Sequence, residues 1–234
     1  MNKKQKSQLI ILSAAIALLV ILYIVANRNT SQQGTLSQPS PQSGTNESAA
    51  GTFHGIPPEG DGGDAMLNKL KNRWSAPVSA TPMSVDEIIG FTHNDLDNAG
   101  RGHRGEWSDD ALAQASGKEK LGVTVEGYLI AAKESGPESC NGHSDIYRDF
   151  HIWIGSSPDA AKSESIIVEM TPFWKEQYPE WTLRRLESEV SSHPKMRVTG
   201  WMLWDEEHPD EVGRSRGSQW EVHPVTKFEE IGGN

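Results

Sequence analysis

The second half of the chain contains short runs in which apolar and polar side chains alternate. The run 220–228 shows this most clearly, because Trp220 and Val222 fall on one face of an extended strand. Glu221 and His223 fall on the opposite face. The pattern predicts a strand that buries one face in a core and places a carboxylate beside an imidazole on the other.

Runs rich in β-branched and aromatic residues predict five strands, over residues 123–133, 149–155, 166–171, 196–205 and 218–228. Leucines and Val190 at helical spacing, after Trp181 or Thr182, predict a helix over residues 179–191, between the third and fourth strands. Gly200 in the middle of the fourth strand predicts a bend or bulge. In the last strand, Pro224 restricts the hydrogen-bond ladder to an edge or a bulge.

The order strand, strand, strand, helix, strand, strand is that of the OB-fold, a five-stranded Greek-key barrel. We therefore predict a mainly β fold with some α, in which residues 122–230 form an OB-fold-like barrel with one internal helix. Residues 64–121 are predicted to be a helical and irregular extension of this domain. Asp64 is a suitable N-cap for a short helix over residues 64–74, and Ser84 with Glu87 forms the sequence pattern of a capping box.

The N-terminal part of the chain has a different character. An unbroken apolar run ends at Ala26 and predicts a transmembrane anchor over residues 8–26. Lys3, Lys4 and Lys6 precede it, so the positive-inside rule places residues 1–7 in the cytoplasm and the rest outside. We therefore expect a single-pass protein of the bacterial inner membrane with a periplasmic C-terminal domain; a cleaved signal peptide is the alternative. Residues 27–63, rich in Ser, Gln, Gly and Pro, are predicted to be a disordered linker.

Charge and cysteine content narrow the classes of function. The net charge is −10, and residues 1–30 contribute +4 of it, so the remainder carries −14. An acidic domain disfavours the phosphate backbone, which makes nucleic acid an unlikely partner. Cys140 is the single cysteine and leaves no internal disulfide framework. With His143 nearby, it resembles half of a metal or nucleophile site.

Polar residues recur on several of the predicted strands. Because strands of a small barrel lie close together, these side chains are expected to gather at one face or end, and we take them as the candidate cluster: Asp149, His151, Glu169, His208, Glu221 and His223. Imidazole and carboxylate groups bind divalent metals, and Asp149, His151 and His223 are the candidate ligands. The same groups could serve as an acid–base pair.

Two simpler interpretations of the cluster stay open. Alternating polar residues also mark the solvated face of a sheet, and a buried hydrogen-bond network would use the same residue types. Glu169 is the member least consistent with a solvated face, because its neighbours along the strand are strongly apolar. If it is buried, its carboxylate needs a partner.

The chain also resembles a family of uncharacterised exported bacterial proteins with an OB-fold-like domain. The resemblance covers about residues 64–230 and rests on Leu67-Asn-Lys-Leu-Lys-Asn-Arg73, Val125-Glu-Gly-Tyr-Leu129, Glu138-Ser-Cys-Asn141, Asp149-Phe-His-Ile-Trp153, Val168-Glu-Met-Thr-Pro172, Val198-Thr-Gly-Trp201, Asp205-Glu-Glu-His-Pro209 and Trp220-Glu-Val-His-Pro-Val225. It implies a shared fold and polar cluster but no particular reaction. The family pattern has a second cysteine or similar residue where this chain has Gly142, which weakens a metal or disulfide role for Cys140.

These observations favour a membrane-tethered extracytoplasmic OB-like module that binds an envelope protein or a small ligand. No glycine motif typical of enzymes lies between a predicted strand and a predicted helix in this sequence, which favours a binding module over an enzyme. The first alternative is a metal-dependent hydrolase resembling a phosphodiesterase, with a divalent metal held by the Asp/His/Glu cluster. The second is single-stranded nucleic-acid binding, in which Trp153 or Trp204 would supply an exposed stacking surface.

Overall fold

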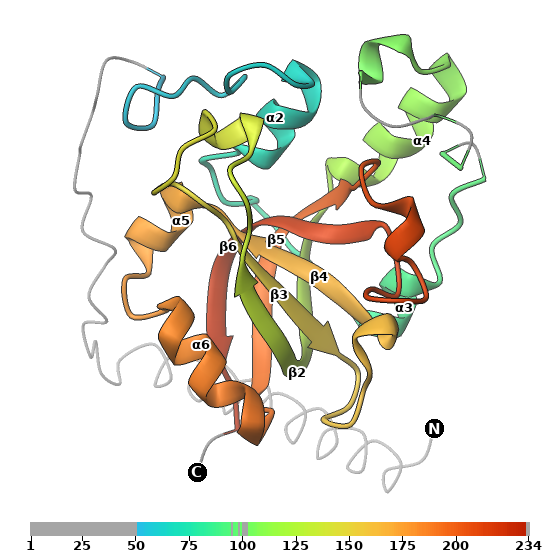
Figure 1. Ribbon diagram of the computed structural model, residues 1–234. Coiled ribbons are helices and arrows are strands. Elements are labelled where there is room, and N and C mark those ends of the chain that lie inside the picture. The colour runs from blue at the N-terminus through green and yellow to red at the C-terminus, as the bar shows by residue number, and fades with distance from the viewer. Residues whose placement is uncertain (1–50, 95, 98, 100–102, 233–234) are drawn as a thin grey trace, which may run out of the picture. The chain divides into compact units, whose positions relative to one another are not determined.

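The structure is a computed structural model, and it describes residues 51–94, 96–97, 99 and 103–232. Five of its strands, arranged in Figure 1, form the barrel: β2 (Gly122–Glu134), β3 (Phe150–Gly155), β4 (Ser165–Met170), β5 (Lys195–Trp204) and β6 (Trp220–Glu230). Among the described residues no helix has the length and apolarity needed to cross a bilayer. The predicted anchor over residues 8–26 lies outside the described residues.

The strands pair in the order β2, β3, β4, β6, β5, and β5 pairs back with β2 to close the barrel. All of these pairings are antiparallel except β4 with β6, which is parallel. This is the topology of the OB-fold, so the predicted five-stranded barrel is confirmed. Each predicted strand agrees with the observed one to within about two residues, which is the usual uncertainty of element ends.

The barrel encloses a core built from the inward-facing residues of all five strands. Its largest members include Leu129, Ile152, Ile166, Met196 and Trp220, each fully buried. Leu186 of helix α6 (Leu183–Glu189) packs against this core from outside the sheet. Helix α6 begins at the N-cap Thr182, as predicted, and the 3₁₀ turn Val190–Ser192 continues it. An additional helix, α5 (Pro172–Gln177), precedes it, so the prediction of one internal helix is wrong.

The predicted bulge at Gly200 is confirmed. The register of β5 with β6 shifts on both sides of Gly200, opposite the segment that contains Pro224. A Cβ atom at Gly200 would lie 2.4 Å from the carbonyl oxygen of Pro224 and 2.6 Å from Cγ1 of Val222. The two strands therefore approach too closely at this point for any residue with a side chain.

The extension before the barrel contains α2 (Ala65–Lys71), β1 (Thr81–Met83), α3 (Val85–Ile89) and α4 (Asp109–Glu119). Asp64 caps α2, and Ser84 with Glu87 forms a capping box on α3, as predicted. Strand β1 adds to the sheet in parallel with β2. In Figure 1, α2 and α4 lie above the barrel.

A buried ion-pair group joins this extension to the end of β5. Arg104, 2% exposed, donates two hydrogen bonds to Glu119 at 2.7 and 2.8 Å. It also contacts Glu206 at 2.9 Å and the carbonyl oxygen of Trp204 at 2.7 Å. Because Glu119 ends α4 and Glu206 follows β5, one guanidinium connects two parts of the domain.

Residues 51–63 correct the predicted extent of the linker. The amide of Asp61 donates to the carbonyl oxygen of Ser139 at 2.8 Å, and Asn68 donates to the carbonyl oxygen of Glu59 at 2.7 Å. Ile56 packs against Gly142. This segment therefore docks on the loop between β2 and β3, and the disorder predicted for residues 27–63 is wrong for residues 51–63.

Candidate functional site

A cleft of about 330 Å³ lies between the loop that joins β2 to β3 (residues 135–149) and the loop that joins β5 to β6 (residues 205–219). The corresponding strand face and loops form the usual ligand-binding surface of OB-folds. Six carboxylate residues and two lysines, Lys71 and Lys133, line the cleft. The carboxylate residues are Glu138, Glu169, Asp205, Glu207, Glu211 and Glu221.

The barrel strands bring a buried acidic group to one side of this cleft. His151 of β3 and Glu169 of β4 are directly opposite each other in the register, and Nδ1 of His151 lies 2.7 Å from Oε1 of Glu169. Val222 of β6 pairs with Val168 of β4, which places Glu221 and His223 beside this pair. All of these polar residues are less than one-tenth exposed, which excludes the solvated-face interpretation.

His223 lies at the centre of the group. Its Nδ1 is 3.1 Å from Oε1 of Glu221 and 3.5 Å from Oε2 of Glu169. Its Nε2 is 3.6 Å from Oδ2 of Asp149. The other oxygen of Asp149 accepts a hydrogen bond from Asn141 at 2.9 Å. The imidazole therefore has a carboxylate on each side.

Burial changes the ionisation of these carboxyl groups. It raises the pKa of Asp149 to about 8, with Glu138 adding to the rise and His223 opposing it. It also raises the pKa of Glu169 to about 8, against the effect of His223. Burial and the neighbouring Asp205 raise the pKa of Glu221 to about 7. A cation bound among these groups would favour their ionised forms.

His151 is held as a neutral imidazole beside the cleft. Burial, together with the charge of Arg216, lowers the pKa of His151 to about 4. Its ring also contacts Trp153, with the centroids 4.6 Å apart. With Nδ1 at Glu169, the Nε2 atom is buried and has no hydrogen-bond partner among the described residues.

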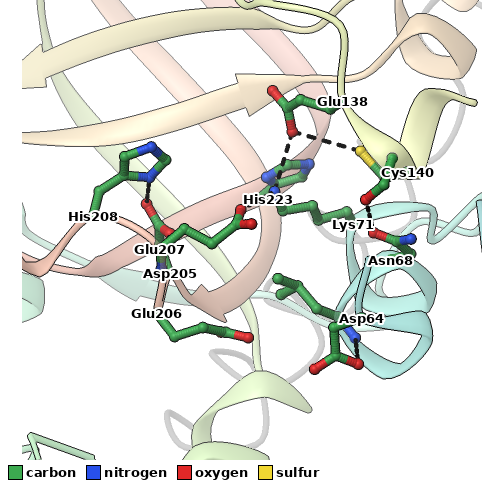
Figure 2. A network of polar contacts seen from close by, with 12 residues as sticks. Asp64, Asn68, Lys71, Glu138, Cys140, Asp205, Glu206, Glu207, His208 and His223 are labelled. Carbon is green, nitrogen blue, oxygen red and sulfur yellow. Dashed lines mark hydrogen bonds and ion pairs between the residues drawn. The ribbon is translucent and has the colours of Figure 1, made fainter. Parts of the chain in front are cut away.

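Cys140 and Glu138 extend the polar group toward α2. Figure 2 shows Glu138 between the sulfur of Cys140, at 3.6 Å, and Nζ of Lys71, at 3.1 Å. Burial raises the pKa of the Cys140 thiol well above its usual value, and Asp149 adds to this effect. Burial acts to raise the pKa of Glu138 as well, but Lys71 and His223 together with a hydrogen bond from Ser135 outweigh it, and the pKa falls to about 2. A buried thiol in this state is a poor nucleophile.

A second polar group forms the wall of the cleft on the β5–β6 side. Oδ2 of Asp205 lies 2.8 Å from Nδ1 of His208 and also accepts from the fully buried Arg216. Figure 2 shows the contact between Asp205 and His208. The hydrogen bond to Asp205 raises the pKa of His208 to about 9, although burial opposes it. Arg216 also contacts Glu221, at 3.4 Å, and so links the two groups.

This pair makes stability depend on pH. Because the pKa of His208 rises from 6.5 to about 9 on folding, the folded chain binds this proton more tightly than the unfolded chain. The stabilisation is complete below about pH 6.5 and declines as the pH rises through about 9. We expect His208→Ala to lower the free energy of unfolding by up to about 1 kcal/mol at pH 6 and by much less at pH 10, since the side chain is half-exposed. Urea denaturation at the two pH values measures this, and equal losses would contradict it.

The structure places the predicted site residues in three ways. It brings Asp149, His151, Glu169, Glu221 and His223 into one buried group, and Cys140 adjoins them through Asp149. His208 lines the same cleft but pairs with Asp205 instead. His143 is exposed and belongs to neither of the two potential metal-binding groups of three residues found in the described part of the chain, so a role for it beside Cys140 stays a prediction.

Sequence reasoning did not identify Lys71, Glu138, Asn141 and Arg216 as members of the site. Glu138 and Asn141 belong, together with Cys140, to the motif Glu138-Ser-Cys-Asn141. This motif was the sequence signal that could have identified them. Trp153 and Trp204 are 3% and 1% exposed, so neither supplies the stacking surface expected for nucleic-acid binding.

Comparisons with known proteins do not assign the chain to a family. No protein-family model matches the chain, and no curated protein matches it in sequence. Among solved structures, it is similar to the crystal structure of yeast Stn1 and Ten1, with a TM-score of 0.35 and 13% sequence identity over 72% of this chain and 69% of that chain. The resemblance to exported bacterial proteins stays a prediction.

Proposed function

We propose that the protein is a membrane-tethered, extracytoplasmic OB-type module that binds a small ligand bearing cationic groups. The observation that carries the proposal is the cleft between the β2–β3 and β5–β6 loops, in which six carboxylate residues face two lysines and the protonated His208. A cleft lined mainly by one sign of charge attracts ligands of the opposite sign. The same charges disfavour a phosphate backbone.

Exposed carboxylates at the rim are suited to the first contact with such a ligand. The side chains of Glu207 and Glu211 are 49% and 36% exposed. The buried carboxylates lie behind them. A flexible polyamine is a suitable probe, because its ammonium groups can reach several carboxylates at once.

We expect spermidine to bind the metal-free full chain in detergent at low salt, as measured by calorimetry. The double change Glu207→Gln, Glu211→Gln should weaken binding roughly 2- to 10-fold, since each exposed charge pair contributes up to about 1 kcal/mol. Glu126→Gln is the control, because Glu126 pairs with Lys195 and Arg197 on an exposed strand surface outside the cleft.

Two results would contradict the cleft as the binding site. One is an equal loss of spermidine affinity in the Glu126→Gln control and the double variant. The other is tighter binding of single-stranded oligothymidine than of spermidine under the same conditions, which would support the nucleic-acid alternative instead.

The tether is the second part of the proposal, and the apolar run that ends at Ala26 supports it. We expect the full chain in the bacterial membrane fraction and a chain starting at residue 27 in the soluble fraction. Protease added to spheroplasts should remove a C-terminal epitope from the full chain. A protected epitope, or a soluble full chain, would contradict the orientation or the anchor.

A metal-dependent hydrolase is the alternative function. His151 favours it, because this neutral imidazole lines the cleft with an unpartnered Nε2 and could accept a proton there. The alternative requires a metal ion in the acidic group. It therefore fails if the metal site described next does not exist.

A further inference from the structure

Besides His151, three buried polar side chains in the acidic group have unused atoms. The atoms are Oδ2 of Asp149, Oε2 of Glu169 and Nε2 of His223, and none has a hydrogen-bond partner within the described part of the chain. Asp149 and His223 are fully buried and Glu169 is 6% exposed. Buried polar groups are nearly always satisfied, so a purely structural network would leave few of these atoms unpaired. Three such atoms in one place indicate a missing partner.

The positions of these residues suit a single ion. One ligand atom from each of Asp149, Glu169 and His223 lies within 4.8 Å of the others. Nε2 of His223 and Oδ2 of Asp149 are 3.6 Å apart. Two ligands bound to a tetrahedral zinc at about 2.0–2.2 Å lie roughly 3.3–3.6 Å apart.

Glu221 prepares His223 for this role. With Glu221 ionised, the 3.1 Å contact requires the proton of His223 on Nδ1, which leaves the lone pair on Nε2 toward Asp149. Metal-binding histidines usually donate their other ring N–H to a carboxylate in this way. Glu169 is oriented similarly, because its other oxygen contacts His151 at 2.7 Å.

We propose that Asp149, Glu169 and His223 bind one divalent transition-metal ion, with zinc as the best fit. Two carboxylates and an imidazole are ligands that zinc accepts, and the ion would offset the cost of burying two carboxylates. Magnesium fits poorly, because it retains several waters and prefers oxygen ligands. The site lies behind the cleft rim and does not depend on the proposed cationic ligand.

The test uses the tag-free full chain in detergent, stripped with EDTA and then dialysed against zinc. We expect one zinc per chain by elemental mass spectrometry, a dissociation constant of about micromolar or tighter by competition with a chelating dye, and a zinc-dependent rise in melting temperature. Magnesium at the same concentration should give neither effect. A wild-type chain that folds but binds no zinc, or that binds magnesium equally well, would overturn the proposal.

Isosteric variants locate the site. Asp149→Asn and Glu169→Gln should each weaken zinc binding at least about 100-fold and abolish the zinc-dependent rise in melting temperature, because direct ligands matter more than the outer contacts that change affinity 10–100-fold. Glu207→Gln, in the same cleft but outside the group, should bind zinc as the wild type does. Circular dichroism of the metal-free variants shows that they are folded. Unchanged zinc affinity in folded Asp149→Asn would overturn the assignment, whereas spermidine binding without zinc would leave the proposed function intact.

Discussion

Replacing Arg104 with methionine is expected to lower the free energy of unfolding by about 3–5 kcal/mol. The change removes the cation that forms ion pairs with Glu119 and Glu206, and these carboxylates are 4% and 2% exposed. Glu119 would keep the hydrogen bond from the amide of Trp204 at 3.1 Å, but both buried carboxylates would lose their ion-pair partner, which is costly. Urea denaturation of the full chain in mild detergent, followed by tryptophan fluorescence, measures the loss.

Arg197→Met is the matched control for Arg104→Met. Arg197 pairs with Glu126 on the surface, and both side chains are more than 40% exposed. Its loss should cost no more than about 1 kcal/mol. Adding Glu119→Gln and Glu206→Gln to Arg104→Met should recover part of the stability, because the unpaired charges are then removed. Similar losses for the two arginine variants would show that the buried group does not hold the extension to the barrel.

Gly200→Ala is expected to destabilise the barrel by about 1–3 kcal/mol, since the new Cβ would overlap the carbonyl oxygen of Pro224. The opposite sign is expected for Gly117→Ala. Gly117 lies within α4, and a Cβ there meets no described atom within 4 Å. Alanine should stabilise that helix by about 0.5–1 kcal/mol.

Measuring the free energy of unfolding of both glycine variants under identical conditions separates the effect of side-chain packing from that of backbone conformational preference. A neutral Gly200→Ala would mean that the two strands separate easily at the bulge. A destabilised Gly117→Ala would mean that α4 packs closely at that position. Either result would contradict the spacing described for the corresponding residue.

The sequence specifies the barrel well because its signals are local. In each strand, the alternation of apolar and polar residues indicates which face is buried. Gly200 and Pro224 mark the place where the hydrogen-bond ladder between β5 and β6 changes register. Helix α4 was not predicted, because Ala111 and Ala115, which it buries, form only a weak apolar pattern. Residues 51–63 resemble a linker in composition, yet contacts such as the packing of Phe53 on Tyr147 and the hydrogen bond from Asp61 to Ser139 dock them on the domain.

The candidate site was predictable in part for the same reason. The pairs Asp149 with His151 and Glu221 with His223 are two residues apart, so strand geometry alone places each pair on one face. Lys71 and Arg216 come from a separate helix and from a loop, and local patterns do not indicate where such segments dock. Their partners became evident only with the tertiary structure.

The position of β6 in the barrel has a consequence for how the domain is completed. β6 is the last strand of the described residues, and it lies between β4 and β5, pairing with both. Until residues 220–230 are available, β4 and β5 each present an unpaired edge, and such edges invite association with other chains. Closure also pairs Gly122 with Trp201, two residues far apart in sequence, and such contacts form slowly. Strand β6 therefore both supplies His223 and pairs the edges that β4 and β5 would otherwise leave open.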